Sequence, residues 1–180
     1  MINIDNVSYS YSKGGGVSNI NLNIDDGEFI FMIGPTGSGK TTILRLIYMD
    51  LFPKAGTVSI DKYDSQTIKR RKIPYVRRKI GVIFQNYHLL EDRNLFENIA
   101  LPLHVLGYDK DEIIDLVNES IDDIGLNGKE SHYPYELSGG EQQRACVARA
   151  LIKDPDIILA DEPTGNLDPV ASFELIKLFE

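Results

Sequence analysis

The sequence has no tryptophan and only one cysteine among its 180 residues. The lone Cys146 excludes a disulfide or a cysteine-ligated metal centre within the chain. Long apolar runs are also missing, since the stretch Ile43–Phe52 is interrupted by Arg45 and Asp50. A membrane-spanning helix needs about 20 apolar residues, so none is expected. The N-terminus carries no secretory signal pattern.

Positive charge is scarce, because 19 Lys and Arg residues face 27 Asp and Glu residues for a net charge of −8. This acidic balance argues against nucleic acid as a partner. The basic residues form two runs, Lys69–Lys72 and Arg77–Lys79. Such runs most often form a solvated face, and contact with anionic lipid headgroups is the alternative.

Three of the 15 glycines lie in the segment Gly34–Thr41 (GPTGSGKT). This segment matches the phosphate-binding pattern G-x-x-x-x-G-K-[ST]. Its three glycines let the backbone turn so that N–H groups point at phosphate oxygens. Lys40 then reaches the β and γ phosphates, and the Thr41 hydroxyl takes a Mg²⁺ coordination position.

The residues on either side support this interpretation. Glu28–Ile33 is an apolar run that predicts a buried strand, and Ile43, Leu44, Ile47 and Leu51 recur at helical spacing. A strand, a glycine loop and a helix together aim a helix N-terminus at an anion. A glycine-rich turn without a ligand is the alternative, and the agreement of motif and flanks argues against it.

A second motif, Leu137–Arg144 (LSGGEQQR), has the form of a helix capping box. Ser138 is expected to accept a hydrogen bond from the N–H of Glu141, whose side chain reaches back. The two glycines between them leave the helix start bare, so a phosphate can sit on it. Taken alone, the segment fits an ordinary helix cap equally well.

An acidic pair, Asp161 and Glu162, follows the short apolar run Ile157–Ala160. Open α/β sheets place ligand chemistry at the carboxyl ends of their strands. Asp161 suits the Mg²⁺ shell, and Glu162 suits the orientation or deprotonation of an attacking water. Taken alone, two solvated carboxylates at the start of a loop are the simpler interpretation.

In this order, the three motifs resemble the nucleotide-binding domain of ATP-binding cassette proteins. The resemblance implies ATP and Mg²⁺ as cofactors, Glu162 and Gln85 as catalytic residues, and Thr41, Gln85 and Asp161 as metal ligands. Tyr11 resembles the aromatic residue that stacks on adenine. The residues implied to bind ATP are Tyr11, Gly34, Pro35, Thr36, Gly37, Ser38, Gly39, Lys40, Thr41, Thr42, Ser138, Gly139, Gly140, Glu141 and Asp168.

The fold implied by the resemblance is an α/β P-loop NTPase of ABC type. It has a mostly parallel sheet core, an antiparallel β subdomain and a helical subdomain. We expect one ATP-binding domain over residues 1–180, with the sheet core at 1–85 and 150–180. The Q-loop and the helical lobe are expected at about 86–149.

Local patterns predict several elements of this fold. Asn19–Asp25 alternates with period two, and Gly56–Ile60 and Lys79–Phe84 are further candidate strands. A short helix is expected within Tyr63–Val76. The helical lobe is expected to contain one apolar stripe, formed by Ile113, Leu116, Val117, Ile121 and Ile124.

The family resemblance also implies partners. Two copies pack head to tail around two ATP molecules, so that the capped helix of one copy completes the site of the other. Val82–Leu103 and Ala160–Asp168 resemble the cell-division branch, which implies an integral membrane subunit of the FtsX type and a place on the cytoplasmic face of the plasma membrane. ATPases of lipoprotein release and macrolide export share Ala160–Asp168 and remain an alternative.

The segment after Gln85 is more apolar than a surface connection requires. In this family, the groove beside it receives a helix of the membrane subunit, so Gln85 is expected to link the Mg²⁺ site to that partner. Packing of the helical lobe on the sheet is the equal alternative.

Other classes of ATPase fit less well. A chromosome-organising or DNA-repair ATPase needs a long coiled coil, and this chain lacks sustained heptads. A translation-type ATPase would have tandem cassettes and a basic surface. A degenerate binding module without turnover stays open.

One feature departs from the family. A switch histidine normally follows the acidic pair, and here His88, His104 and His132 all precede it. We therefore expect a chain truncated at its C-terminus, with the switch region missing and Val170–Glu180 an incomplete helix. A sheet that closes differently, with a distorted active site, is the alternative. Weak nucleotide binding and poor turnover are expected for the 180-residue chain.

Overall fold

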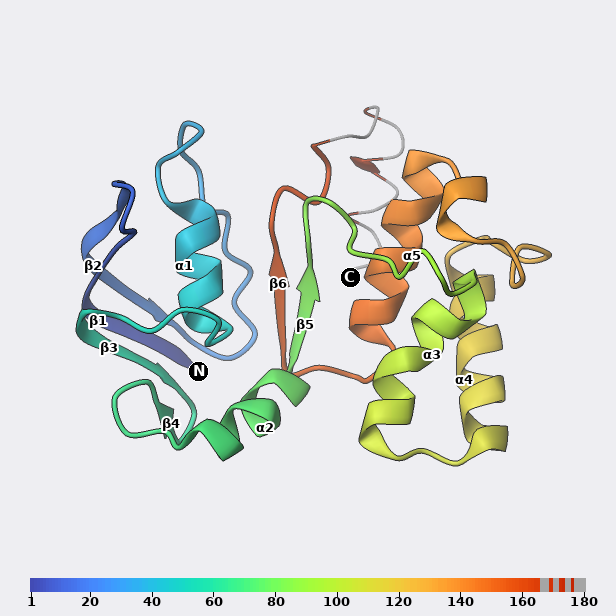
Figure 1. The fold of residues 1–180 in the computed structure, drawn as a ribbon, viewed down its shortest axis with the longest axis horizontal. Coiled ribbons are helices and arrows are strands. Elements are labelled where there is room, and N and C mark those ends of the chain that lie inside the picture. Colours follow the sequence, from blue (N-terminus) through green and yellow to red (C-terminus); the bar gives the residue numbers. More distant parts are fainter. Residues whose placement is uncertain (166–168, 170–171, 174–175, 177–180) are drawn as a thin grey trace. The chain divides into compact units, whose positions relative to one another are not determined.

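The structure is a computed structural model, which describes residues 1–165 together with Pro169, Ser172, Phe173 and Ile176. The chain divides into two compact units, Met1–Arg78 and Lys79–Glu180. Figure 1 shows their elements along the chain, from the blue N-terminal strands to the orange helices. Each unit has its own sheet and helices and is described by itself.

The N-terminal unit contains an antiparallel sheet with the strand order β2-β1-β3-β4. Its strands are β1 (Ile2–Ser10), β2 (Gly16–Ile24), β3 (Ala55–Ile60) and β4 (Tyr63–Asp64). The strands expected around residues 19–25 and 56–60 are confirmed as β2 and β3. Alternate apolar residues of β1 and β3, such as Ile4 and Val58, are buried, because successive side chains of a strand point to opposite faces.

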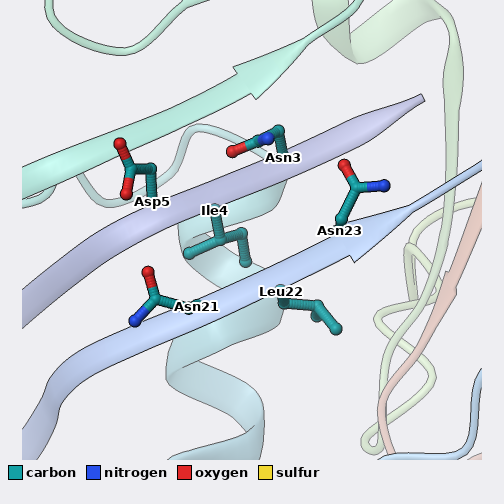
Figure 2. Close-up of a pocket in the computed structure, with 6 residues that line it drawn as sticks. All are labelled: Asn3, Ile4, Asp5, Asn21, Leu22 and Asn23. Carbon is teal, nitrogen blue, oxygen red and sulfur yellow. The ribbon is translucent and has the colours of Figure 1, made fainter.

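Polar side chains occupy the other positions of β1 and β2. Figure 2 shows Asn3 and Asp5 on β1 near Asn21 and Asn23 on β2, where they line an open hollow. The hollow contains a carboxylate and no Lys or Arg among its lining residues. A phosphate anion would be repelled by this charge, so the hollow is a solvated sheet face.

Two helices complete the N-terminal unit. Helix α1 (Lys40–Ile47) buries Leu46 and Ile47 and ends before Leu51, one turn earlier than the apolar spacing predicts. Helix α2 (Ile73–Arg78) follows a 3₁₀ turn within the region where a short helix was expected. Arg77 links them, since its guanidinium donates to the carbonyl oxygens that follow α1, at 3.0 Å for Met49.

The prediction of a buried strand over Glu28–Ile33 is wrong. The structure assigns no strand there, and the side chains of Phe31 and Ile33 are 72% and 92% exposed. A strand needs hydrogen-bond partners on a neighbouring strand. None of the strands described in the N-terminal unit pairs with this segment.

The C-terminal unit contains a parallel pair, β5 (Ile80–Ile83) and β6 (Ile157–Ala160). Both strands lie where the apolar runs predict them, and their register aligns Ile83 with Ala160. Within the described residues the parallel sheet has these two strands only.

Three helices of the C-terminal unit have bounds within the described residues. They are α3 (Leu95–Leu106), α4 (Lys110–Asp123) and α5 (Gly139–Leu151), with a 3₁₀ turn at Pro134–Glu136. The expected helical stripe is confirmed, since Ile113, Val117 and Ile121 of α4 are buried in one core with Leu95, Ile99, Leu103 and Ala145. In the described part of the chain, no helix is long and apolar enough to cross a bilayer.

Replacement of Ile113 by alanine should lower the free energy of unfolding by about 3 kcal/mol, because it opens a cavity in the helical core. Ile114 is the matched control: it is the next residue of α4, and its side chain is 37% exposed, against 2% for Ile113. Ile114→Ala should cost about 1 kcal/mol or less. Urea denaturation monitored by circular dichroism measures both values. Equal losses would contradict the core position of Ile113.

Candidate nucleotide site

The glycine loop leads directly into α1 in the N-terminal unit. Gly39 is the N-cap residue of this helix, with φ of 99°. A Cβ atom at Gly39 would lie 2.4 Å from Cγ1 of Val17, so both conformation and space require glycine. The helix start has no side-chain cap and no acidic residue in its first turn. Its positive end is therefore available to an anion.

Lys40 and Tyr11 lie at the same helix start. The Lys40 ammonium donates to the carbonyl oxygens of Gly34 at 2.9 Å and Pro35 at 3.2 Å, which holds its charge over the loop. The hydroxyl groups of Tyr11 and Thr42 are 3.2 Å apart and share a hydrogen bond. The structure thus brings the aromatic residue and the loop together within one unit.

The acidic pair lies at the carboxyl end of β6 in the C-terminal unit. The Asp161 N–H donates to Ile83 O at 2.9 Å and extends the parallel ladder by one bond. Beyond it, Gln85 Nε2 donates to Glu162 Oε2 at 2.9 Å, which joins residues 77 positions apart in the sequence. Two of the predicted catalytic residues are therefore in direct contact.

Glu162 has an unusual backbone conformation, with φ of 49° in the left-handed region. A residue with a Cβ atom pays about 1 kcal/mol for this conformation, and such positions cluster at functional sites. The Glu162 carbonyl accepts a hydrogen bond from the N–H of Gly165 at 3.1 Å. The turn after β6 thus holds the Glu162 carboxylate next to Gln85.

The predicted capping box is present at the start of α5. The Ser138 N–H donates to Glu141 Oε2 at 2.9 Å, and the Glu141 N–H donates to Ser138 Oγ at 3.4 Å. Gly139 and Gly140 form the first turn between them. The other carboxylate oxygen of Glu141 accepts a hydrogen bond from the Lys129 ammonium. Lys129 and the Ser138 N–H together lower the pKa of Glu141 to about 2.

Arg149 is a structural residue of this region that the sequence did not indicate. From the last turn of α5 it donates to the carbonyl oxygens of His88 and Tyr87, each at 2.7 Å. Both of these residues have positive φ, 51° and 58°. Arg149 thus holds the strained segment that follows Gln85 against α5. From the sequence, Arg149 could be assigned only to a helix, because its hydrogen-bond partners lie about 60 positions away.

Asn98 fixes the next part of the same connection. Its side chain is 1% exposed and its Nδ2 donates to the carbonyl oxygens of Leu90, Arg93 and Asn94, each at 3.0 Å. Its Oδ1 accepts from the Leu90 N–H at 2.7 Å. A buried amide with this many partners holds the turn between Leu90 and α3 in one shape.

The residues expected to bind nucleotide are divided between the two units. Tyr11 and residues 34–42 belong to the N-terminal unit, and Gln85, the acidic pair and residues 138–141 belong to the C-terminal unit. Asp168, which completes the expected set, lies outside the described residues, as do most residues of the helix expected over Val170–Glu180.

The ordered motifs define a nucleotide-binding cassette, and comparison with known proteins agrees. The model of the family described as "ABC transporter" matches residues 17–165. The chain therefore belongs to the ABC transporter family.

Within this family, the chain is similar to the cell division ATP-binding protein FtsE. It is 42% identical over 182 residues to FtsE of Mycobacterium tuberculosis and 43% identical over 181 residues to that of Bacillus subtilis. Each alignment covers the whole chain and 79% of the relative. FtsE of Escherichia coli K12 is 41% identical, with 82% of its length covered. The expected resemblance to the cell-division branch is confirmed.

Solved structures agree as well. The dimeric post-hydrolysis structure of the ATP-binding cassette MJ0796, bound to ADP and Pi, superimposes with a TM-score of 0.91. The sequence identity is 36%, over 99% of this chain and 81% of that one. The expected P-loop NTPase fold of ABC type is confirmed.

The low pKa of Glu141 predicts a pH-dependent contribution to stability. Since its pKa is lowered from 4.5 to about 2 in the folded chain, the stabilisation is present above pH 4.5 and is lost as the pH falls towards 2. Lys129 is partly exposed, so we expect a loss of only about 1 kcal/mol. Between pH 7 and pH 3, the unmodified chain should therefore lose about 1 kcal/mol more stability than Glu141→Gln. Urea titrations at the two pH values measure both losses.

Glu119→Gln is the matched control for this measurement. Glu119 lies exposed on α4 and makes no ion pair among the residues that the structure describes. Its substitution removes the same charge, and it should leave the pH dependence unchanged. The same pH dependence in the Glu141→Gln variant and the unmodified chain would contradict the assignment.

Proposed function

We propose that this chain is the ATP-binding and ATP-hydrolysing subunit of an FtsEX-like membrane complex in bacterial cell division. The similarity to FtsE proteins of three bacteria, over the whole chain, supports the assignment to cell division. For hydrolysis, the observation that carries the proposal is the hydrogen bond between Gln85 and Glu162 at the end of β6. This contact holds a carboxylate where open α/β sheets carry out their chemistry.

In this proposal the N-terminal unit binds the triphosphate. Tyr11 stacks on the adenine ring, and the backbone of residues 34–42 surrounds the phosphates. To reach a β or γ phosphate oxygen, Lys40 exchanges its hydrogen bonds to Gly34 O and Pro35 O for ionic ones. A charge-assisted bond is stronger than a neutral one, so the exchange favours bound ATP.

The C-terminal unit supplies the hydrolytic group. Glu162 orients a water molecule and accepts its proton as the water oxygen attacks the γ phosphorus and ADP leaves. The amide of Gln85 holds the Glu162 carboxylate in place. Thr41, Gln85 and Asp161 are proposed Mg²⁺ ligands, an oxygen donor set of the kind that Mg²⁺ prefers alongside phosphate oxygens. When bound, Mg²⁺ neutralises charge on the transferred phosphate.

A complete site requires two copies of the chain. We propose a head-to-tail homodimer in which residues 138–141 of one copy close over the phosphates bound by residues 34–42 of the other. The bare glycine turn at the start of α5 supports this, because its N–H groups suit an anion. The similar cassette MJ0796 is dimeric and binds ADP and Pi. We propose the same seam for Asp168, which lies outside the described residues.

The proposed membrane partner is an integral subunit of the FtsX type, which holds the chain at the cytoplasmic face of the plasma membrane. The connection after Gln85 supports a docking role in part. Leu90 is 40% exposed, while Leu89 and Phe96 pack on the helical core. Leu89 and Phe96 thus contribute to the packing of the helical core, and Leu90 offers an exposed apolar side chain to the proposed partner.

Two further expectations stay predictions. One is that residues 1–180 form a single cassette, with the sheet core at 1–85 and 150–180. The other is that ATP turnover by the 180-residue chain is slow.

Lys40→Ala should weaken ATP binding by about 100-fold, since it removes charge-assisted bonds to two phosphates. Titration with a fluorescent ATP analogue measures the affinity. Lys62→Ala is the control: Lys62 is exposed in the same unit, and its loss changes the net charge equally. Unchanged affinity in Lys40→Ala would contradict the proposed function.

Partner binding should depend on the turn before α3. Arg93→Glu reverses an exposed charge whose ion pair with Glu97, at 3.7 Å, contributes little to stability. We expect about tenfold weaker association with a co-expressed FtsX-type protein in pull-down titrations and unchanged ATP affinity. Lys110→Glu, at an exposed position at the start of α4, should leave both affinities unchanged. An equal loss of partner affinity and ATP affinity in Arg93→Glu would contradict a separate partner-binding role for this turn.

A further inference from the structure

The start of α5 contains an electrostatic conflict. A helix N-terminus attracts anions, but its first turn contains Glu141, which is ionised and 18% exposed. A phosphate brought to this turn by a second copy of the chain would meet a like charge. Unless that charge is offset, the carboxylate opposes the anion that the bare glycines attract.

Lys129 offsets this charge directly. Its ammonium donates to Glu141 Oε1, while Glu141 Oε2 accepts the Ser138 N–H at 2.9 Å. One carboxylate oxygen therefore serves the capping box and the other serves the ion pair. Neither oxygen is left to compete for the N–H groups of the glycine turn.

The backbone around Lys129 is anchored on both sides. The Lys129 N–H donates to Leu126 O at 3.1 Å, and the Lys129 carbonyl accepts from the His132 N–H at 2.9 Å. Leu126 is 1% exposed, in the helical core. The ammonium thus extends from a turn that is held in place rather than from a free loop.

The same turn is bonded to the start of α3. The N–H groups of Leu95 and Phe96 donate to the carbonyl oxygens of His132 and Glu130, at 2.8 Å and 3.0 Å. These N–H groups lie in the first turn of α3 and have no partner within their own helix. The turn that includes Lys129 therefore connects the starts of α3 and α5.

We infer that Lys129 is a positioning residue of the nucleotide site, which neutralises Glu141 so that the Gly139–Gly140 turn can accept a phosphate of ATP bound by a second copy of the chain. The inference rests on the proposed function. The ammonium of Lys129 contacts the Glu141 carboxylate, so Lys129 acts through Glu141.

A purely structural ion pair is the competing explanation, and a double-mutant cycle separates the two. Lys129→Met, Glu141→Gln and the double variant are prepared in the full chain with Glu162→Gln, so that ATP persists. A glutamine at position 141 retains the capping box without the charge. Analytical ultracentrifugation then measures the dimer dissociation constant with ATP present.

Lys129→Met should weaken the ATP-dependent dimer about tenfold, because an uncompensated carboxylate remains at the helix start. In the Glu141→Gln background, Lys129→Met should change the dimer dissociation constant less than twofold. Lys129→Arg should retain the parental value. ATP affinity of the monomer, measured by analogue titration, should not change in Lys129→Met or Lys129→Arg. Lys110→Met, which removes an equivalent exposed charge on α4, is the control.

Two results would overturn the inference. One is an unchanged dimer constant in Lys129→Met, and the other is an equal loss in both backgrounds, which would assign Lys129 a structural role. A parent chain that binds ATP but forms no ATP-dependent dimer would instead overturn the proposed head-to-tail function, and the inference with it.

Discussion

The parallel pairing of β5 with β6 is the constraint on which the candidate catalytic site depends. Parallel strands end at the same edge of a sheet, so the register of Ile83 with Ala160 brings the residues after both strands together. Gln85 and Glu162 meet at 2.9 Å for this reason, although the helical lobe lies between them in the sequence. A slip of one residue would turn each side chain to the opposite face.

The starts of the helices are the second organising feature. Helix α1 has no side-chain cap, which leaves its positive end for an anion. Helices α3 and α5 instead begin with complete capping boxes. At α5 the carboxylate of the box is paired with Lys129. The N-termini of these three helices thus differ in charge.

Sequence reasoning succeeded where a structure depends on neighbours in the chain. The capping box of α5, the buried stripe of α4 and the strand β3 were each predicted from spacing within a few residues. The strand expected over Glu28–Ile33 failed, because a strand exists only when another strand pairs with it. Its apolar pattern was correct for a buried segment, but the strands described in its unit do not supply a partner.

The sequence by itself determined the glycine loop, the capping box of α5 and the ABC family, because these depend on residue type and short spacing. Only the tertiary structure decided which side chains orient the candidate catalytic and phosphate-binding groups. Gln85 meets Glu162, Arg149 holds the carbonyl oxygens beyond Gln85, and Lys129 neutralises Glu141. Each pair is 12 to 77 positions apart, and no local pattern specifies a partner that strand register and helix packing bring into contact.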